Sequence, residues 1–363
     1  MKTNKKNSLM IVFDDMALGG IQIKILDLIK KITKDHPKIK IIICLRYKRG
    51  FFLKKIPKNI KLISPKFHTN RFDMFWFIFW LTFQVFKFNP NKILSFMDLG
   101  SIPSLIAKKI LFLKKINITI GEDILTSKYV YIESFPKIRL KLIKYLYPKA
   151  NQILVQTPVQ KKDLHQIIGH SDNISVSPNW LPLNFPPKIK RLKKEIDILF
   201  IGRIEAQKNL KKFIYIIKKL SLTNPKIKAV IIGNGTETKN IKKLVIKLKL
   251  KNNIQILPAT SFPQKFYLKS KIFLLTSNYE GFPLTVLEAI SCGCYPVVNN
   301  IPELKKFFKY QPNKFIFKNQ QEAVNIINEQ LLKPNYKIIK FYQNNIVSSQ
   351  NRNISLFVKK CLN

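Results

Sequence analysis

Short apolar runs alternate with stretches of helical spacing along most of this 363-residue chain. Apolar residues that recur every third or fourth position predict amphipathic helices, and short apolar runs between them predict buried strands. Strands that alternate with helices pair in parallel, because each helix carries the chain back across one face of the sheet. The sequence therefore predicts an α/β protein built on doubly wound parallel sheets.

The alternation occurs twice. In the first half we expect strands at 10–13, 39–44, 61–63, 93–96, 117–120 and 152–156, and helices at 21–34, 72–88, 102–113 and 138–147. In the second half we expect strands at 198–201, 229–232, 254–257, 272–276, 296–298 and 314–317. Four prolines and a basic run separate the two series, which predicts a domain boundary. The expected organisation is a first domain at 1–178, a linker at 179–195, a second domain at 196–335 and a helical tail at 336–363.

The formal net charge of +45 restricts the possible partners. A field of this sign attracts anionic lipids, nucleic acid or phosphorylated substrates. Most of the basic residues are lysines scattered along the chain, whereas readout of bases needs clusters of arginine and aromatic side chains. We therefore expect attraction to an anionic membrane surface and no specific nucleic-acid partner.

Cysteine spacing and hydropathy indicate the compartment. The four cysteines, at positions 44, 292, 294 and 361, form no CxxC pair, so we expect reduced thiols in a cytoplasmic protein. The apolar run Leu9 to Phe13 is too short for a signal peptide. Residues 72–88 are very apolar but contain polar side chains and fall short of the roughly 20 residues of a spanning helix. We expect a peripheral protein at the inner face of the cell membrane.

Residues 271–299 predict a strand, a polar loop, a helix and a second strand. Pro283 suits the first helical position, and Gly293 suits the helix exit. Glu280 lies in the loop, and Glu288 follows eight residues later, about one turn inside the helix, where free backbone N–H groups favour anions. Acidic residues are common in such helical turns, so the pair alone does not define a site.

The whole string around these two glutamates is more specific. Ser277, Glu280-Gly281-Phe282-Pro283, Leu287-Glu288-Ala289, Gly293 and Pro296-Val297-Val298 together resemble the E-x7-E signature of family 4 retaining glycosyltransferases. The resemblance implies a GT-B fold, in which two Rossmann-like domains face a cleft and the C-terminal helix packs back on the first domain. It covers nearly the whole chain and is strongest from Asp197 to Asn299.

The resemblance also implies the roles of individual residues. Arg203 and Lys208, in a segment similar to the GR…KN element of the family, would hold the donor diphosphate and stabilise its developing charge. Glu288 would accept hydrogen bonds from the ribose. Glu280 and the backbone of Gly281, Phe282, Pro283 and Leu284 would hold the transferred sugar, and Gly20 would approach it from the first domain. The expected catalytic residues are Glu280, Arg203 and Lys208, and no metal is expected.

Two departures from the family limit what the resemblance implies. Pro258 stands where relatives usually have a glycine that contacts the nucleobase, so the base is open, although a uridine-linked donor is expected. Residues 95–98 and 121–123 contain no histidine, which many relatives carry there. Retaining members are thought to use the departing phosphate as the proton acceptor, so the reaction does not require a protein base.

The sequence therefore predicts a hexosyl- or N-acetylhexosaminyl-transferase that uses a nucleotide sugar and no cofactor. The expected acceptor is a saccharide or lipid-linked glycan in bacterial cell-surface polysaccharide or lipopolysaccharide synthesis. Two alternatives stay open: a nucleotide-sugar epimerase on the same fold, and a basic nucleic-acid-binding protein, which would explain the charge but not the E-x7-E string.

Overall fold

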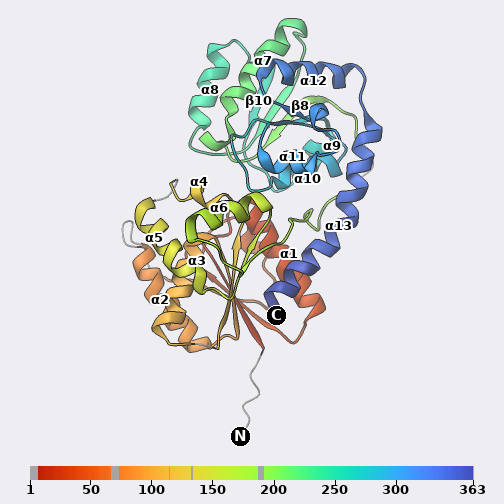
Figure 1. The fold of residues 1–363 in the computed structure, drawn as a ribbon. Helices are drawn as coiled ribbons and strands as arrows, with labels where there is room; N and C mark the ends of the chain where they lie inside the picture. Colours follow the sequence, from red (N-terminus) through yellow and green to blue (C-terminus); the bar gives the residue numbers. More distant parts are fainter. Residues whose placement is uncertain (1–6, 67–72, 114, 132–133, 187–191, 363) are drawn as a thin grey trace. The chain divides into compact units, whose positions relative to one another are not determined.

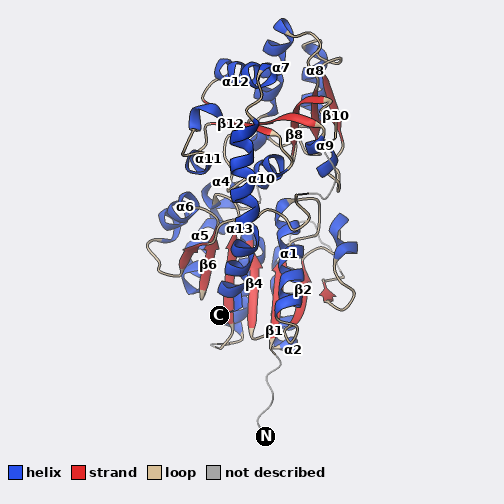
Figure 2. Ribbon diagram, turned by 90° about the vertical axis from the view of Figure 1, so that its right-hand side faces the viewer, coloured by secondary structure: helices blue, strands red, loops and turns tan. Residues whose placement is uncertain are grey.

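The computed structural model describes residues 7–66, 73–113, 115–131, 134–186 and 192–362. The chain divides into two compact units (Figures 1 and 2). The first unit is Met1–Asn179 with Arg352–Asn363, and the second is Trp180–Asn351. Leu181 and Phe185, from the stretch predicted as a linker, are buried in the core of the second unit.

The first unit is a seven-stranded parallel sheet in the order β3-β2-β1-β4-β5-β6-β7. The strands are β1 (Ser8–Phe13), β2 (Lys40–Leu45), β3 (Lys61–Ile63), β4 (Lys92–Phe96), β5 (Asn117–Glu122), β6 (Gln152–Val155) and β7 (Ile174–Val176). The helices are α1 (Gly20–Asp35), α2 (Asp73–Phe88), α3 (Met97–Ile110), α4 (Thr126–Tyr129), α5 (Pro136–Leu146) and α6 (Pro158–Ile168), with 3-10 turns η1 (Phe51–Lys55) and η2 (Tyr147–Lys149). Helices α2, α3 and α5 cover one face and α1 the other (Figure 1).

The second unit is a six-stranded parallel sheet in the order β10-β9-β8-β11-β12-β13. Its strands are β8 (Ile196–Ile201), β9 (Ala229–Ile232), β10 (Ile254–Leu257), β11 (Ser270–Leu275), β12 (Tyr295–Asn299) and β13 (Ile316–Phe317). Its helices are α7 (Leu210–Thr223), α8 (Thr238–Lys247), α9 (Gln264–Leu268), α10 (Leu284–Ser291), α11 (Pro302–Phe307) and α12 (Gln320–Leu332), with η3 (Ala206–Lys208) and η4 (Pro312–Lys314). The strand order reverses between β8 and β11, which is where ligands bind in such sheets.

The prediction of two parallel α/β domains is confirmed, and each predicted strand overlaps an observed one. The short edge strand β7 and helix α6 were not predicted. Helix α3 begins at Met97 rather than at 102, so Asp98 lies in its first turn. Gly100 permits this early start, because a Cβ atom there would lie 2.8 Å from the carbonyl oxygen of Val12 in β1.

The last helix, α13 (Tyr336–Leu362), ends in the first unit, whose C-terminal segment begins at Arg352. There the Phe357 ring stacks on the Phe96 ring of β4, with centroids 6.4 Å apart. The Nζ atom of Lys24 lies 4.5 Å from the Phe357 ring centroid and 2.7 Å from Oδ1 of Asp123. Phe357 therefore covers a buried ion pair.

The described residues also bear on compartment and membrane. All four cysteines are free and buried, and burial raises the pKa of each thiol. Within the described residues, no helix combines the length and the apolar character needed to cross a bilayer.

Replacing Phe357 with alanine is expected to destabilise the first unit by about 3–5 kcal/mol, because a fully buried aromatic ring leaves a cavity. Chemical denaturation followed by circular dichroism measures the change. Leu356→Ala, which alters an exposed neighbour on the same helix, serves as the control. Equal stability of the two variants would contradict the packing role of Phe357.

Candidate active site

Two loops of the second unit lie side by side where the strand order reverses. Residues 202–209 follow β8 and residues 276–283 follow β11, and these neighbouring parallel strands end at the same edge of the sheet. The Asn278 N–H donates to the Gln207 carbonyl oxygen at 2.9 Å. Thr276 Oγ1 donates to the Lys208 carbonyl oxygen at 3.0 Å. Main-chain geometry therefore joins the two loops into one structure.

Glu280 is the centre of this structure. Its Oε1 accepts hydrogen bonds from Lys208 Nζ and from Ser277 Oγ, both at 2.6 Å. Gln207 Nε2 lies 3.4 Å from the other oxygen and donates to the Tyr279 carbonyl at 2.8 Å. Only 6% of Glu280 is exposed. The predicted Lys208 and Glu280 thus meet as a largely buried ion pair, in which each fixes the position of the other.

Local sequence explains why Lys208 points this way. Asn209 adopts the left-handed conformation, with φ of 48°, and its side chain accepts a hydrogen bond from the Lys212 N–H at the start of α7. Asparagine tolerates this conformation better than most residues and is a favoured helix N-cap. Its Nδ2 also donates to Asn278 Oδ1 at 2.9 Å, which ties the loop to its neighbour.

Arg203 lies on the same loop but is exposed. The structure records no ion pair or hydrogen bond of its side chain with the described residues. It lies close enough to Tyr279 for its charge to lower the pKa of that phenol, although burial of Tyr279 dominates and raises it. The site therefore holds one paired cation, Lys208, and one solvent-facing cation, Arg203.

The loop that contains Glu280 presents free main-chain donors. Within the described residues, the structure records no hydrogen-bond acceptor for the N–H groups of Gly281, Phe282, Leu284 and Thr285. Helix α10 begins at Leu284, and its N-terminus carries a partial positive charge. Pro283 is the N-cap residue, with extended backbone at φ −72° and ψ 109°, and not the first helical residue as predicted. This geometry suits an anion or sugar hydroxyls.

Glu288 occupies a different environment from Glu280. It lies in the second turn of α10, is buried, and accepts a hydrogen bond from the Tyr267 hydroxyl at 2.9 Å. Burial raises the pKa of Glu288 to about 7, and the Tyr267 hydrogen bond opposes this shift. The bond to Tyr267 uses Oε2, and no described residue is recorded as a partner of Oε1. Glu288 therefore shares no recorded hydrogen-bond partner with Glu280.

Gly20, the remaining predicted site residue, is in the first unit. It is the first residue of α1 and is exposed, and the preceding Gly19 is the extended N-cap residue. The two glycines contribute no side chains at the N-terminus of α1, and the Gln22 side chain lies against Gly19.

Three partners of the site residues were missed by sequence reasoning. Gln207 and Ser277 hold Glu280, and both stand inside the quoted motifs, so hydrogen-bonding side chains beside a loop glutamate could have indicated them. Tyr267 gave no such signal, because it lies in α9, 21 residues from the glutamate that it contacts.

A second group of buried charges lies in the first unit, in and just after the segments where relatives are expected to carry a histidine. Glu122 Oε1 accepts a hydrogen bond from the Tyr147 hydroxyl, and Asp98 Oδ2 accepts one from Arg139 Nε at 2.6 Å. With the Lys24–Asp123 pair, these contacts form a buried polar group at the ends of β4 and β5. Burial raises the pKa of Glu122 to about 8. These acids are enclosed and do not face solvent.

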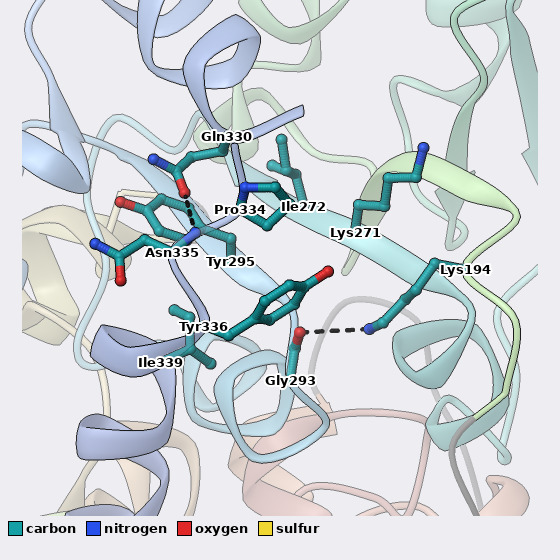
Figure 3. A pocket seen from close by; sticks show the side chains of 10 residues that line it. All are labelled: Lys194, Lys271, Ile272, Gly293, Tyr295, Gln330, Pro334, Asn335, Tyr336 and Ile339. Carbon is teal, nitrogen blue, oxygen red and sulfur yellow. Dashed lines mark hydrogen bonds between the residues drawn. The ribbon is translucent and has the colours of Figure 1, made fainter. Parts of the chain in front are cut away.

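Figure 3 shows a small hollow elsewhere in the second unit, lined by Lys194, Gly293, Tyr295, Tyr336 and neighbouring residues. Lys194 Nζ donates to the Gly293 carbonyl oxygen at 3.3 Å. The hollow has a volume of about 20 Å³, which accommodates about one water molecule. The hollow is too small for a nucleotide sugar, so it is not a donor site.

Two doubly wound parallel units, with cations and free amides at the switch point of the second, define the GT-B class of folds. Anabaena HepE, solved in complex with UDP and glucose, has this architecture. It superposes with a TM-score of 0.79 at 16% identity, over 98% of this chain and 99% of HepE. Residues 184–345 match the family model of glycosyl transferases group 1. The second unit therefore contains a glycosyl transferases group 1 domain.

Curated relatives agree with this assignment. An uncharacterized glycosyltransferase of Methanocaldococcus jannaschii is 30% identical over 176 residues, 46% of this chain and 43% of the relative. The amylovoran biosynthesis glycosyltransferase AmsD of Erwinia amylovora is 22% identical over 288 residues, 77% of each chain. The chain spans about half the length, or less, of several curated relatives that it matches.

The raised pKa of Glu122 predicts how the stability of the first unit depends on pH. The native state holds the proton up to about pH 8, whereas the unfolded chain releases it near pH 4.5. The stabilisation is therefore complete below about pH 4.5 and is lost as the pH rises towards 8. Glu122→Gln, which keeps an acceptor for Tyr147, should flatten this loss in denaturant titrations at several pH values. The exposed Glu195→Gln is the control, and equal slopes for wild type and Glu122→Gln would contradict the account.

Proposed function

We propose that the protein is a retaining glycosyltransferase that moves a hexosyl or N-acetylhexosaminyl group from a nucleotide diphosphate sugar. The acceptor is a saccharide or lipid-linked glycan in bacterial surface polysaccharide or lipopolysaccharide synthesis. The observation that carries the proposal is the convergence of Arg203, the Lys208–Glu280 pair and the free amides before α10 at the switch point of a glycosyl transferases group 1 domain.

Charge development explains the arrangement. As the sugar bond breaks, the diphosphate gains negative charge, and cations fixed beforehand stabilise that state more than the ground state. Lys208 is held by Glu280, so it needs little reorganisation, and the exposed Arg203 supplies a charge with no internal partner. The N-terminus of α10 adds its dipole. These groups can carry the diphosphate charge without a metal ion, so transfer is expected to continue in chelator.

Glu280 has a second role in this proposal. A carboxylate can accept several hydrogen bonds, and Lys208 and Ser277 both use Oε1, so Oε2 retains capacity for a sugar hydroxyl. The N–H groups of Gly281 to Leu284 hold the sugar on the other side, and Gly20 approaches from the first domain. The departing phosphate oxygen takes the proton of the attacking hydroxyl, so acceptor and phosphate lie on one face of the sugar.

The donor is a uridine-linked sugar in this proposal, with Glu288 as acceptor for the ribose hydroxyls. Glu288 Oε1, for which no described residue is recorded as a partner, and the presence of UDP in the HepE complex support this choice. The name of the amylovoran relative supports a surface polysaccharide as product. The net charge supports work at the cytoplasmic side of an anionic membrane.

Arg203→Ala and Glu288→Gln are each expected to lower kcat/KM for transfer about a hundredfold, because the first removes a cation from the charge that develops on the diphosphate and the second removes the carboxylate that accepts from the ribose hydroxyls. Radiolabelled sugar transfer measures the effect, and circular dichroism verifies the fold. Lys211→Ala, which removes an exposed cation at the start of α7, is the matched control. Wild-type turnover by folded Arg203→Ala or Glu288→Gln would refute the site.

Uridine diphosphate at millimolar concentration is expected to raise the melting temperature, because a ligand that binds only the native state stabilises it by mass action. A panel of uridine and guanosine diphosphates and their sugars, with product analysis by chromatography, identifies the donor. Release of nucleotide with transfer or hydrolysis supports a transferase, whereas a free epimerised sugar would identify an epimerase. No thermal shift with any nucleotide would refute donor binding.

A further inference from the structure

Helix α2 carries an exposed aromatic stripe. Its members are Phe75, Trp76, Phe79, Phe83 and Phe86, and each is between 46% and 69% exposed. At about 100° per residue these five positions fall within an arc of about 100°, so they share one face of the helix. The stripe extends about 16 Å along the helix axis. It is a continuous surface and not a scatter of single exposed rings.

The opposite face of α2 packs into the hydrophobic core of the first unit. Phe77, Leu81 and Val85 are buried against the residues of α3 and α5 that cover the sheet. A helix that packs on one side normally has polar residues on the other, and a helix that is apolar all round is normally covered all round. Contiguous exposed apolar surface of this kind marks a site of interaction. In the folded first unit, each of these five side chains therefore remains at least 46% exposed.

Cations and further apolar side chains lie at the ends of the neighbouring helices. Lys61 Nζ lies 4.5 Å from the Phe88 ring, at the end of α2. Lys109, at the end of α3, lies 5.1 Å from the Tyr145 ring of α5, and Phe112 just beyond is 88% exposed. Helices α2, α3 and α5 pack in this order on the same face of the sheet (Figure 1). Exposed rings flanked by lysines are typical of surfaces that enter a lipid interface.

We propose that the aromatic stripe of α2 inserts into the interface of an anionic lipid membrane, with α2 parallel to the membrane plane. The net charge of the chain favours a lipid membrane over a second copy as the partner of the stripe. A second copy would bring one +45 chain against another, which is unfavourable, whereas anionic lipid headgroups complement the lysines. The proposed function places the protein at an anionic membrane, and this proposal names the surface that would bind it. Membrane binding by the stripe does not depend on transfer activity.

The first test is sedimentation of the whole chain with vesicles of phosphatidylcholine and phosphatidylglycerol. Phe79→Ser, Phe83→Ser and Phe86→Ser together should lower the partition coefficient about tenfold or more, because three rings no longer leave water. Phe262→Ser, Tyr310→Ser and Leu332→Ser, which remove equally exposed apolar side chains from the second unit, are the matched control. We call the triple Phe→Ser protein the stripe variant. The ratio of the wild-type partition coefficient to that of the stripe variant should stay the same from ~0.15 M to ~0.5 M salt, because salt screens charge but does not oppose burial of the rings.

The second test uses Trp76, which is on the stripe, in a Trp80→Phe background, because Trp80 is also on α2 and is partly exposed, whereas Trp180 is buried. Its fluorescence should shift to shorter wavelength with vesicles and be quenched by brominated lipid, and Trp76→Phe should remove both signals. Wild-type binding by the stripe variant, no binding to anionic vesicles at ~0.15 M salt, or a dimer in ultracentrifugation that only the stripe variant abolishes, would overturn the proposal.

Donor hydrolysis separates this proposal from the proposed function. The stripe variant should hydrolyse a nucleotide sugar in solution at the wild-type rate, because none of the substituted residues belongs to the donor site. Loss of vesicle binding with intact hydrolysis supports the stripe. Intact vesicle binding by a chain with neither transfer nor hydrolysis supports the stripe and refutes the transferase.

Discussion

The ion pair between Lys208 and Glu280 holds the candidate site together. It joins two loops that leave neighbouring strands, and both of its members are largely removed from water. A buried charge without a partner is costly, so each side chain requires the other. Ser277 and Gln207 also donate hydrogen bonds to the carboxylate. The loop before α10, with its free amides, therefore has a defined position before any ligand arrives.

This arrangement changes the simplest interpretation of the motif. Sequence reasoning assigned Lys208 to the diphosphate and Glu280 to the sugar as independent contacts. The structure makes them one unit, and it leaves Arg203 as the solvent-facing cation of the loop. Glu288 is a separate element, held by Tyr267 and surrounded by the core. The two glutamates of the signature thus have different surroundings, and burial raises the pKa of Glu288.

The fold was largely predictable because hydrophobic alternation reports directly on buried strands. Both sheets and their central strands follow from it. What the sequence did not indicate depends on contacts between distant residues. Tyr267 reaches Glu288 from another helix, and the early start of α3 depends on the close approach of Gly100 to Val12. The sequence also does not show that one face of α2 is exposed, because apolar composition does not say which face of a helix is covered.

The position of Phe357 has a consequence for the order of folding during synthesis. The first unit consists of residues 1–179 and 352–363, and Phe357 covers the buried pair of Lys24 and Asp123. A ribosome makes the whole second unit before it reaches residue 352. The second unit can therefore fold while the first still lacks its final helix segment, and the nascent first unit exposes a charged pair that must wait for its cover.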